Sequence, residues 1–337
     1  MSQATKIEWT DVTWNPIRAR SREAPGWIGT HCVKISAGCA NCYAERHNAR
    51  MLPGGGTGLG YVASSTARVE TIFDEGKLAA PLGWKRPRRV FVCSLSDLFG
   101  EWVSDQQIDR VFAAMATAER HTYQVLTKRP GRMRAWFERV AGLGLGLDGK
   151  ATERGCKMFG DREVAWPLPN VWLGVSVEDQ RAADERIPLL LHTPAAVRFV
   201  SAEPLLAPID FARVKTGCGE WATGCCCSAP KCGHTKLDWV IVGGESGPGA
   251  RPCDVDWIRR IVEQCKEARV ACFVKQLGHA VEARNDQIAD VWPDNTETTA
   301  SASYQGAPLR VLLRHSKGGD PAEWPEDLRV REFPTLR

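Results

Sequence analysis

The sequence predicts an α/β protein, namely a partial or complete (β/α) barrel with parallel strands, a Cys-rich insertion and a C-terminal appendage. Short strands of almost continuous apolar residues alternate with helical segments between residues 89 and 276, a pattern typical of a parallel sheet covered by helices. Polar residues follow each strand, at the positions where the loops of a barrel form its active site. A doubly wound sheet is the alternative, because the sequence does not show whether the sheet closes.

The composition is that of a globular protein with a large core. Of the 337 residues, 43% are hydrophobic and 25% are charged. The net charge of +4 permits a nucleic-acid partner without requiring one. No apolar run is long enough to cross a bilayer, and the first residues lack the apolar core of a signal peptide. We therefore expect a cytoplasmic protein that has no membrane partner.

The first elements surround a cysteine loop. Residues 6–19 are expected to form a strand that runs into a loop, with Pro16 ending the regular part. The cysteine loop comes next, and a helix is expected over residues 43–51. Residues 52–66 are rich in Gly, Ser and Thr, which predicts a loop.

Six more strands and four helices are expected to alternate along the rest of the barrel. The expected strands cover residues 89–94, 123–127, 171–177, 197–201, 237–242 and 271–275. The expected helices cover residues 104–120, 131–141, 179–192 and 254–268, and the first of them has one apolar face formed by Ile108, Val111, Phe112 and Met115. We assign residues 1–279 to the barrel, with the Cys-rich insertion at 213–236, and residues 280–337 to the appendage.

Charged and amide side chains follow the expected strands. Because the carboxyl ends of parallel strands meet at one end of a barrel, we expect these side chains to converge there, next to the cysteine loop. For any single residue, the simpler explanation is that polar residues resume where a strand ends. As a set they predict a site, with Lys128 and Glu203 as its catalytic residues. The set comprises Asp97, Lys128, Arg129, Glu178, Asp179, Glu203, Glu245, Ser246, Lys275 and Gln276.

The glycine-rich loop after the sixth strand is a candidate cofactor contact. Gly243 and Gly244 allow a backbone to approach a ligand closely. Glu245, which Ser246 follows, could hold a ribose hydroxyl or an ammonium group, and Arg251 a carboxylate or phosphate. The dinucleotide fingerprint G-x-G-x-x-G is absent. A glycine turn without any ligand accounts for the pattern equally well.

Three cysteines, Cys32, Cys39 and Cys42, lie on one short stretch with the spacing C-x6-C-x2-C. Disulfides are rare in a reducing compartment, so clustered cysteines favour metal binding. Thiolates bind soft or borderline metals, and three of them leave a tetrahedral ion or a cluster one ligand short. The open position could then bind a substrate or a cofactor.

Two metal centres are compatible with these cysteines, a catalytic iron–sulfur cluster and a structural zinc ion. Zinc would take His31 or His47 as its fourth ligand. A closed zinc site usually combines two paired ligand sets, and no second pair adjoins this one. The position of the loop after the first strand of a barrel instead favours a site for chemistry.

A second cysteine cluster lies in the expected insertion. It contains enough ligands for one tetrahedral zinc ion, for which we assign Cys218, Cys227, Cys232 and His234. A small insertion with little apolar content needs such a staple to become ordered. A second iron–sulfur cluster and a loop without metal are the alternatives. The five cysteines outside both clusters are expected to be small buried hydrophobic residues.

Several motifs in this chain occur in the same order as in a known family. They are Trp-Asn-Pro at 14–16, Gly-Cys-Ala-Asn-Cys-Tyr-Ala at 38–44, Leu-Thr-Lys-Arg-Pro at 126–130, Trp-Leu-Gly-Val-Ser-Val-Glu at 172–178, Ser-Ala-Glu-Pro-Leu at 201–205 and Trp-Val-Ile-Val-Gly-Gly-Glu-Ser-Gly at 239–247. Together they resemble the phage-associated three-Cys-motif proteins, a family of unknown function that is regarded as radical-SAM-like.

The resemblance implies a partial barrel with a [4Fe–4S] cluster bound by Cys32, Cys39 and Cys42. In the wider superfamily, the fourth iron chelates S-adenosylmethionine, and an electron from the cluster cleaves it to a 5′-deoxyadenosyl radical that abstracts hydrogen from a substrate. This chain has three extra residues in the first gap of the usual C-x3-C-x2-C motif. Its Tyr43 follows the last cysteine, and its Gly-Gly-Glu comes after the sixth strand, whereas the superfamily has it after the second.

We therefore expect an iron–sulfur enzyme of the radical-SAM type that uses S-adenosylmethionine and depends on a reductant protein. The phage association of the family that the chain resembles, and the basic runs at 85–89 and 128–129, are compatible with a nucleic acid or nucleotide as substrate. One alternative is a zinc-stabilised nucleic-acid-binding protein without redox chemistry. Another is a hydrolytic barrel enzyme that uses the carboxylates at the strand ends with divalent metals.

Overall fold

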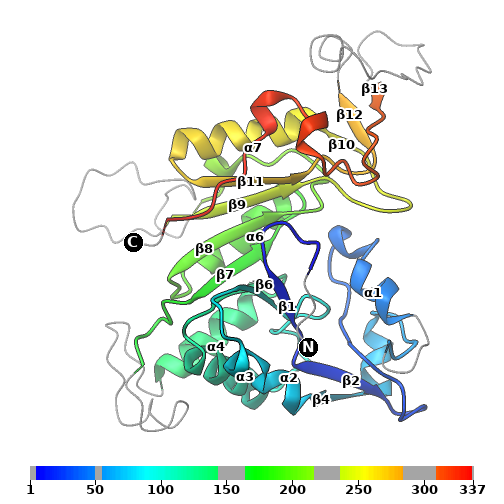
Figure 1. Cartoon of the computed structure of the whole chain (residues 1–337), viewed down its shortest axis with the longest axis vertical. Helices are drawn as coiled ribbons and strands as arrows, with labels where there is room; N and C mark the ends of the chain where they lie inside the picture. The colour runs from blue at the N-terminus through cyan, green and yellow to red at the C-terminus, as the bar shows by residue number, and fades with distance from the viewer. Residues whose placement is uncertain (1–4, 50–54, 143–163, 216–235, 284–308, 336–337) are drawn as a thin grey trace. The chain divides into compact units, whose positions relative to one another are not determined.

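The computed structural model describes residues 5–49, 55–142, 164–215, 236–283 and 309–335. The chain divides into two compact units (Figure 1). The first unit comprises Met1–Val175 and His192–Arg198, and the second comprises Ser176–Leu191 and Phe199–Arg337. Each unit is built around parallel strands.

The parallel strands of the first unit are β1 (Val12–Trp14), β5 (Arg89–Val92), β6 (Thr122–Thr127) and β7 (Val171–Ser176), whose last residue belongs to the second unit. They pair in the order β1-β5-β6-β7. Every residue of β7 is buried, as expected for a strand of a parallel sheet that is covered on both faces.

Three α-helices of the first unit accompany this sheet, namely α2 (Glu75–Ala79), α3 (Asp105–Thr117) and α4 (Pro130–Gly142). Ser104 and Gln107 form a capping box that begins α3. The apolar face predicted for this helix is confirmed, because Ile108, Val111, Phe112 and Met115 are all buried. Aromatic rings of α3 and α4 pack together, with the ring centroids of Phe112 and Trp136 4.3 Å apart.

A small antiparallel sheet is formed by two strands that precede the cysteine loop and one that follows it. It consists of β3 (Ile28–Gly29), β2 (Ile17–Ser21) and β4 (Val69–Phe73), in the order β3-β2-β4. The single strand predicted over residues 6–19 is therefore wrong, since β1 and β2 are separate strands in different sheets. Between the two strands, Pro16 lacks a main-chain donor. The side-chain Oδ1 of Asn15 accepts a hydrogen bond at 3.0 Å from Leu95 N, in the loop after β5. Helix α1 (Tyr43–Asn48) follows the cysteine loop, as predicted.

The parallel strands of the second unit are β8 (Val197–Ala202), β9 (Trp239–Gly243) and β11 (Ala271–Gln276), in the order β8-β9-β11. Only the first two residues of β8 belong to the first unit. The helices are α6 (Gln180–Leu191) and α7 (Val255–Ala268). Helix α7 buries one face, formed by Val255, Ile258, Ile261 and Cys265, and ends at Arg269 in a left-handed conformation.

The described C-terminal segment packs within the second unit. Strands β10 (Cys253–Asp254), β12 (Val281–Ala283) and β13 (Leu309–Val311) form a small sheet. Val274 N on β11 donates to Val330 O at 2.8 Å, and the indole of Trp239 donates to Glu332 O at 2.9 Å. The part of the expected appendage that is described thus contributes to the packing around β9 and β11.

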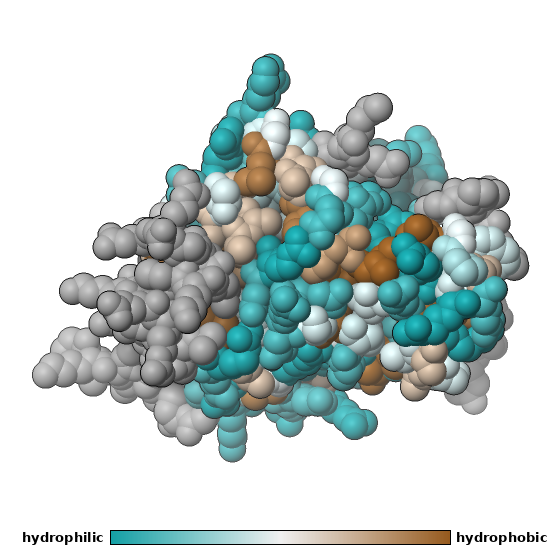
Figure 2. All heavy atoms as spheres, turned by 90° about the horizontal axis from the view of Figure 1, so that it is seen from below, coloured by the Kyte–Doolittle hydropathy of each residue, from teal (hydrophilic) through white to brown (hydrophobic). Residues whose placement is uncertain are grey.

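The predicted α/β class with parallel strands is confirmed, and the arrangement is consistent with a partial (β/α) barrel. The described residues contain a parallel strand at each of the seven predicted places. None of the described helices has both the length and the apolar character that crossing a membrane demands. The face in Figure 2 is mostly hydrophilic, with apolar residues scattered among polar ones.

Candidate metal centre and polar strand ends

The cysteine loop joins β3 to α1 and presents three thiols. Cys32, Cys39 and Cys42 are each half-buried and free of disulfides. A single 3-10 turn, Ala37–Cys39, orders the middle of the loop, and Cys42 occupies the position just before α1. Each cysteine that was predicted to bind metal is thus partly accessible as a residue.

The surroundings of Cys32 and Cys42 favour the protonated form of these thiols in the absence of a cation. Burial raises the pKa of Cys32, the carboxylate of Asp97 raises it further, and Arg129 opposes both effects. Burial also raises the pKa of Cys42, whereas hydrogen bonds from the main-chain amides of Glu45 and Ala44 lower it. Nearby thiols add to both shifts. A bound cation would reverse this balance, because metal ions bind the deprotonated thiolate.

The donor set fits an iron–sulfur cluster in type and number, since such a cluster is held by cysteine thiolates. In the described conformation, however, no three His, Cys, Asp or Glu side chains of the described residues are grouped closely enough to hold a metal ion. Binding a cluster would therefore require Cys32, Cys39 and Cys42 to draw together.

Arg129 connects the cysteine loop to the ends of two parallel strands. It follows β6, and its Nη2 donates to the carbonyl of Val33 at 2.9 Å. Its Nη1 lies 3.1 Å from Oδ2 of Asp97, which follows β5. Its guanidinium also lies over the ring of Trp102, 4.7 Å from the centroid. Within the first unit, the expected convergence of polar strand ends on the cysteine loop is thus present for Asp97 and Arg129.

The predicted catalytic residue Lys128 belongs to the same network through its main chain. Lys128 N donates to Asp97 Oδ2 at 3.1 Å. Asp97 also accepts from Thr127 Oγ1 at 2.7 Å and from Phe99 N at 3.0 Å. A buried carboxylate that accepts this many hydrogen bonds is held in one position.

Asn48 anchors the other side of the cysteine loop. Its Oδ1 accepts from Thr30 N at 2.9 Å and from Thr57 N at 3.1 Å. Its Nδ2 donates to Thr57 Oγ1 at 2.8 Å and to Leu59 O at 2.9 Å. The amide fits because Gly29 has no side chain, since a Cβ there would lie 2.2 Å from Asn48 Oδ1. The sequence contains no signal for this role, because the partners come from two segments outside α1.

Replacing Asn48 by alanine is expected to lower the free energy of unfolding by about 1–3 kcal/mol, because the buried amides of Thr30 and Thr57 lose their acceptor. Urea denaturation of the two proteins measures the difference. Replacing the exposed neighbour Arg46 by alanine is the control and should change the value by less than about 0.5 kcal/mol. Equal effects of both substitutions would contradict the anchoring role.

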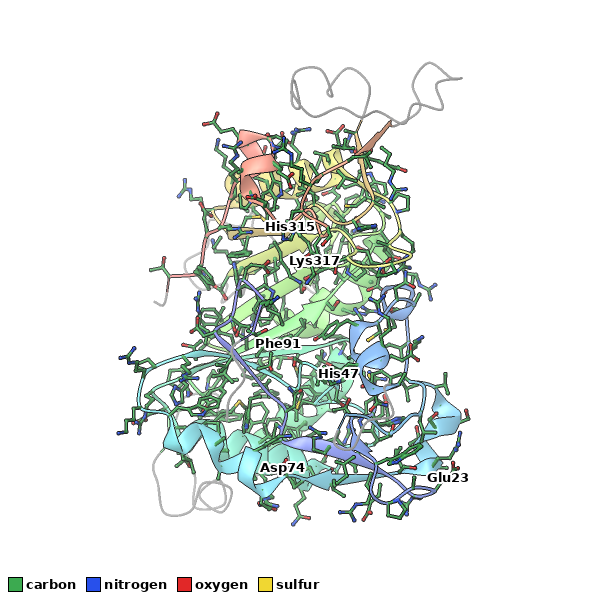
Figure 3. All side chains as sticks on the ribbon, turned by 45° about the vertical axis from the view of Figure 1, so that its right-hand side comes forward. Glu23, His47, Asp74, Phe91, His315 and Lys317 are labelled. Atoms are coloured by element: carbon green, nitrogen blue, oxygen red, sulfur yellow. The ribbon has the colours of Figure 1, made fainter. Side chains whose placement is uncertain are left out.

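The two histidines considered as zinc ligands have different environments. His31 is buried, and its Nε2 lies 3.0 Å from Thr66 Oγ1. Burial, followed by the charge of Arg129, lowers the pKa of His31 to about 4, so the ring is neutral at physiological pH. His47 is exposed on α1 (Figure 3).

In the second unit, Glu203 is paired with two residues of β11. The ammonium group of Lys275 forms an ion pair with its Oε1, and Gln276 Nε2 lies 3.3 Å from the same atom. Gln276 also donates to Gly244 O at 2.9 Å. Three polar residues from the ends of β8 and β11 thus come together, as the pattern of polar strand ends predicted.

Glu245 is buried and is held by Arg251 of its own loop. Arg251 Nη2 lies 2.6 Å from Oε1, and its Nε and main-chain N each lie 2.9 Å from Oε2. The hydrogen bond to Glu245 raises the pKa of Arg251. Glu178, after β7, is paired in the same way with Arg186 of α6 at 3.0 Å. Ser246, the residue after Glu245, is half-buried.

The glycines of the same loop sit against the backbone that follows β11. A Cβ on Gly244 would lie 2.2 Å from Leu277 O, and one on Gly243 would lie 3.0 Å from Gln276 O. Close approach of two backbones is one reason for a glycine at such a position. The glycine pair therefore has a packing role in addition to the proposed contact with a cofactor.

Replacing Gly244 by alanine is expected to destabilise the protein by about 1–3 kcal/mol, because the added methyl group forces the ends of β9 and β11 apart. Thermal and urea unfolding measure this change. The control is Gly83→Ala, where a Cβ would meet no atom within 4 Å. If both variants unfold at the same urea concentration, close packing does not explain Gly244.

The proposed zinc ligands Cys218, Cys227, Cys232 and His234 lie outside the described residues. Of the cysteines outside the two clusters, Cys93, Cys253, Cys265 and Cys272 are buried, as predicted for small hydrophobic residues.

Comparison with known proteins identifies a family without assigning an activity. Neither the curated proteins nor the solved structures include a match to this chain. One family model, described as "Protein of unknown function (DUF5131)", matches residues 4–307. The match spans both clusters of cysteines and all of the polar strand ends, and the chain therefore belongs to the DUF5131 family.

Proposed function

We propose that this protein is an iron–sulfur enzyme of the radical-SAM type, in which Cys32, Cys39 and Cys42 hold a [4Fe–4S] cluster. The observation that carries the proposal is the loop itself, with three free, half-buried thiols between β3 and α1. Cysteine thiolates are the usual ligands of such clusters. When bound, the cluster would supply the electron that cleaves S-adenosylmethionine.

The chain's own residues would position the loop and bind the cofactor. Arg129 and Asp97 hold Val33, next to Cys32, through the contacts at the ends of β5 and β6. Lys128 and Glu203 remain the proposed catalytic residues. Glu203 lies in a polar group with Lys275 and Gln276 that can donate to and accept from a ligand. Gly243, Gly244, Glu245 and Ser246 remain the proposed cofactor contacts.

The proposed substrate is a nucleic acid or a nucleotide, and a reductant protein would deliver the electron. The resemblance to phage-associated proteins and the basic run at 85–89 support this substrate class. We propose the cytoplasm as the location, because free clustered thiols persist in reducing compartments. A zinc ion in the 213–236 insertion remains part of the proposal.

Metal analysis of anaerobically purified and reconstituted protein tests the proposal. We expect about four iron and four sulfide ions per chain, and about one zinc ion if the insertion binds metal. With dithionite as reductant, added S-adenosylmethionine should yield methionine and 5′-deoxyadenosine. Colourless protein that contains zinc and no iron would support the alternative, a zinc-stabilised nucleic-acid-binding protein. Substrate turnover in air, without reductant, would support a hydrolytic enzyme.

A further inference from the structure

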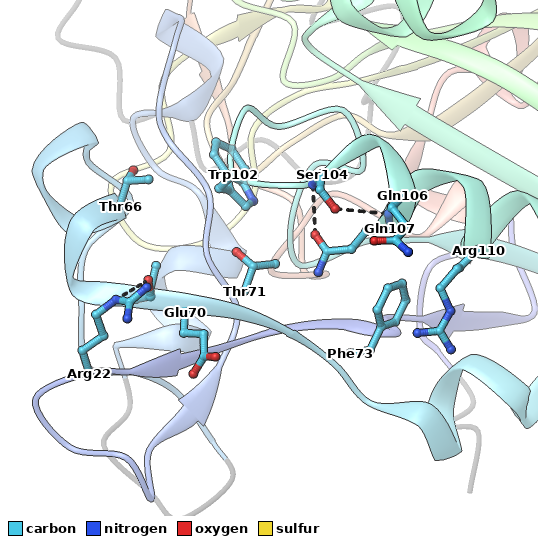
Figure 4. Close-up of a pocket in the computed structure, with 11 residues that line it drawn as sticks. Arg22, Thr66, Glu70, Thr71, Phe73, Trp102, Ser104, Gln106, Gln107 and Arg110 are labelled. Atoms are coloured by element: carbon cyan, nitrogen blue, oxygen red, sulfur yellow. Dashed lines mark hydrogen bonds between the residues drawn. The ribbon is translucent and has the colours of Figure 1, made fainter. Parts of the chain in front are cut away.

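The first unit contains a cavity of about 600 Å³ along strand β4 (Figure 4). One side is formed by β4 together with Arg22, and the other by Trp102 and the first turns of α3. A volume of this size is typical of small-molecule sites. None of the predicted catalytic or cofactor-binding residues lines this cavity.

The main chain of β4 turns hydrogen-bonding groups toward the cavity. In the described residues β4 pairs with β2 alone and forms the edge of its sheet. Arg22 N donates to Arg68 O, and Asp74 N donates to Pro16 O. Because antiparallel pairs alternate, residues 68, 70, 72 and 74 bond to β2, and residues 69, 71 and 73 face outward. The 3.2 Å hydrogen bond from Arg22 Nε to Val69 O agrees with this alternation, in which the carbonyl of Val69 is not used by β2.

Thr71, in the middle of this edge, therefore offers an N–H and a C=O to the cavity. On the opposite wall, the amide of Gln106 is exposed and has no hydrogen bond to another described residue. Ser104 and Gln107 are already occupied by the capping box of α3 (Figure 4). A planar ligand with donors and acceptors along its edge matches Thr71 and Gln106, and a nucleobase has this pattern.

The charges around the cavity are balanced except at Arg22. Arg110 is paired with Glu75 at 2.6 Å, and Glu70 with Arg20 at 3.6 Å. Arg22 uses its Nε for Val69 O, which leaves its terminal guanidinium nitrogens as donors. This balance suits a ligand with one anionic group better than a polyphosphate or a long nucleic acid.

The cavity also adjoins the cysteine loop. Thr66 and Trp102 both line the cavity. Thr66 Oγ1 lies 3.0 Å from His31 Nε2, and the ring of Trp102 lies 5.0 Å from that of His31. His31 directly precedes Cys32. A ligand in the cavity is therefore separated from the cysteine loop by a single layer of side chains.

We infer that this cavity binds a nucleoside 5′-monophosphate, with the base between Thr71 and Gln106 and the phosphate at Arg22. Binding itself does not require a cluster, and only the role of this ligand as substrate rests on the proposed function. The inference deepens the proposed substrate class by assigning it a site.

Isothermal titration calorimetry of the full chain tests the inference, with AMP, GMP, CMP and UMP as probes. We expect at least one of them to bind at one site per chain. Gln106→Ala should weaken binding about tenfold through its lost hydrogen bond. Arg22→Ala should weaken the monophosphate about tenfold but leave binding of the corresponding nucleoside unchanged. Arg181→Ala, at an exposed arginine of α6, is the matched control.

A pair of substitutions at Thr71 tests the main-chain contact. Thr71→Pro removes the outward N–H without removing a bond of the β2–β4 ladder, a position where strands accept proline. Thr71→Ala keeps the N–H and serves as its control. We expect the proline variant alone to lose affinity while its circular dichroism spectrum is retained.

Several results would overturn the inference. These are the absence of binding by all four probes, binding that the cavity variants leave unchanged, and equal binding of inorganic phosphate alone. Displacement of the nucleotide by S-adenosylmethionine would instead assign the cavity to the cofactor. Repeating the titration with a variant that lacks Cys32, Cys39 and Cys42 separates the two proposals. Nucleotide binding should survive in this variant, whether or not the unmodified protein binds a cluster.

Discussion

Replacing Cys32, Cys39 and Cys42 together by alanine is expected to remove all cluster iron and abolish cleavage of S-adenosylmethionine. A cluster that is held by three thiolates has no other protein ligands once these are gone. Iron should fall from about four atoms per chain to none, with loss of the visible absorption. Anaerobic reconstitution followed by iron and sulfide analysis measures the first effect, and the yield of 5′-deoxyadenosine measures the second.

The same variant distinguishes an enzyme cluster from a structural zinc ion. The three thiols are half-buried, so the triple variant should remain folded and lose no more than a few kcal/mol of stability. Circular dichroism and urea unfolding check this point. A structural zinc ion would make the variant unfold instead. Ser36→Ala, whose hydroxyl lies 3.9 Å from Cys39 Sγ in the same loop, is the control and should retain iron and activity.

Replacing Arg129 by methionine is expected to lower the free energy of unfolding by about 3–5 kcal/mol, the usual cost of leaving one partner of a buried ion pair alone. The side chains of Arg129 and Asp97 are only 6% and 8% exposed. The variant also loses the bond to Val33 O and the contact with Trp102. Urea unfolding measures the change in stability, and cluster reconstitution should become less efficient because the cysteine loop loses its support.

Arg134→Met is the matched control for this variant. Arg134 forms an exposed pair with Glu138 one helical turn away, and such pairs contribute little to stability. Its removal should change the free energy of unfolding by less than about 0.5 kcal/mol. The double variant with Asp97→Ala should be less destabilised than the sum of its single variants, because neither charge is then left unpaired. Additive effects would show that Arg129 and Asp97 act independently.

The regular elements of this fold could be predicted because their signals are local. The apolar strands at 171–177 and 237–242 contain β7 and β9, and the spacing of Ile108, Val111 and Met115 marks the buried face of α3. The prediction was wrong at residues 6–19, where Trp14-Asn15-Pro16 divides two strands. Strand β1 pairs with β5 and strand β2 pairs with β4, and these partners lie 48 to 78 residues away in the sequence.

The candidate site was partly predictable for the same reason. Cysteine spacing identifies three possible ligands on one loop, and the strand ends identify Glu203, Lys275 and Gln276 as neighbours. The sequence does not show that Arg251 holds Glu245 or that Asn48 anchors the loop at Thr30. These contacts depend on the path of the backbone between the two partners. Hydrophobic periodicity contains no information about that path.

The sequence by itself determined the α/β class, the order of strands and helices and the three thiols on one loop, because each follows from residue spacing within one segment. Only the tertiary structure decided which groups meet. In the folded chain, Arg129 and Asp97 form an ion pair beside the cysteine loop, and the outer edge of β4 lines a cavity. Hydrogen bonds and buried charges join distant segments, so their partners are selected by packing and not by local sequence.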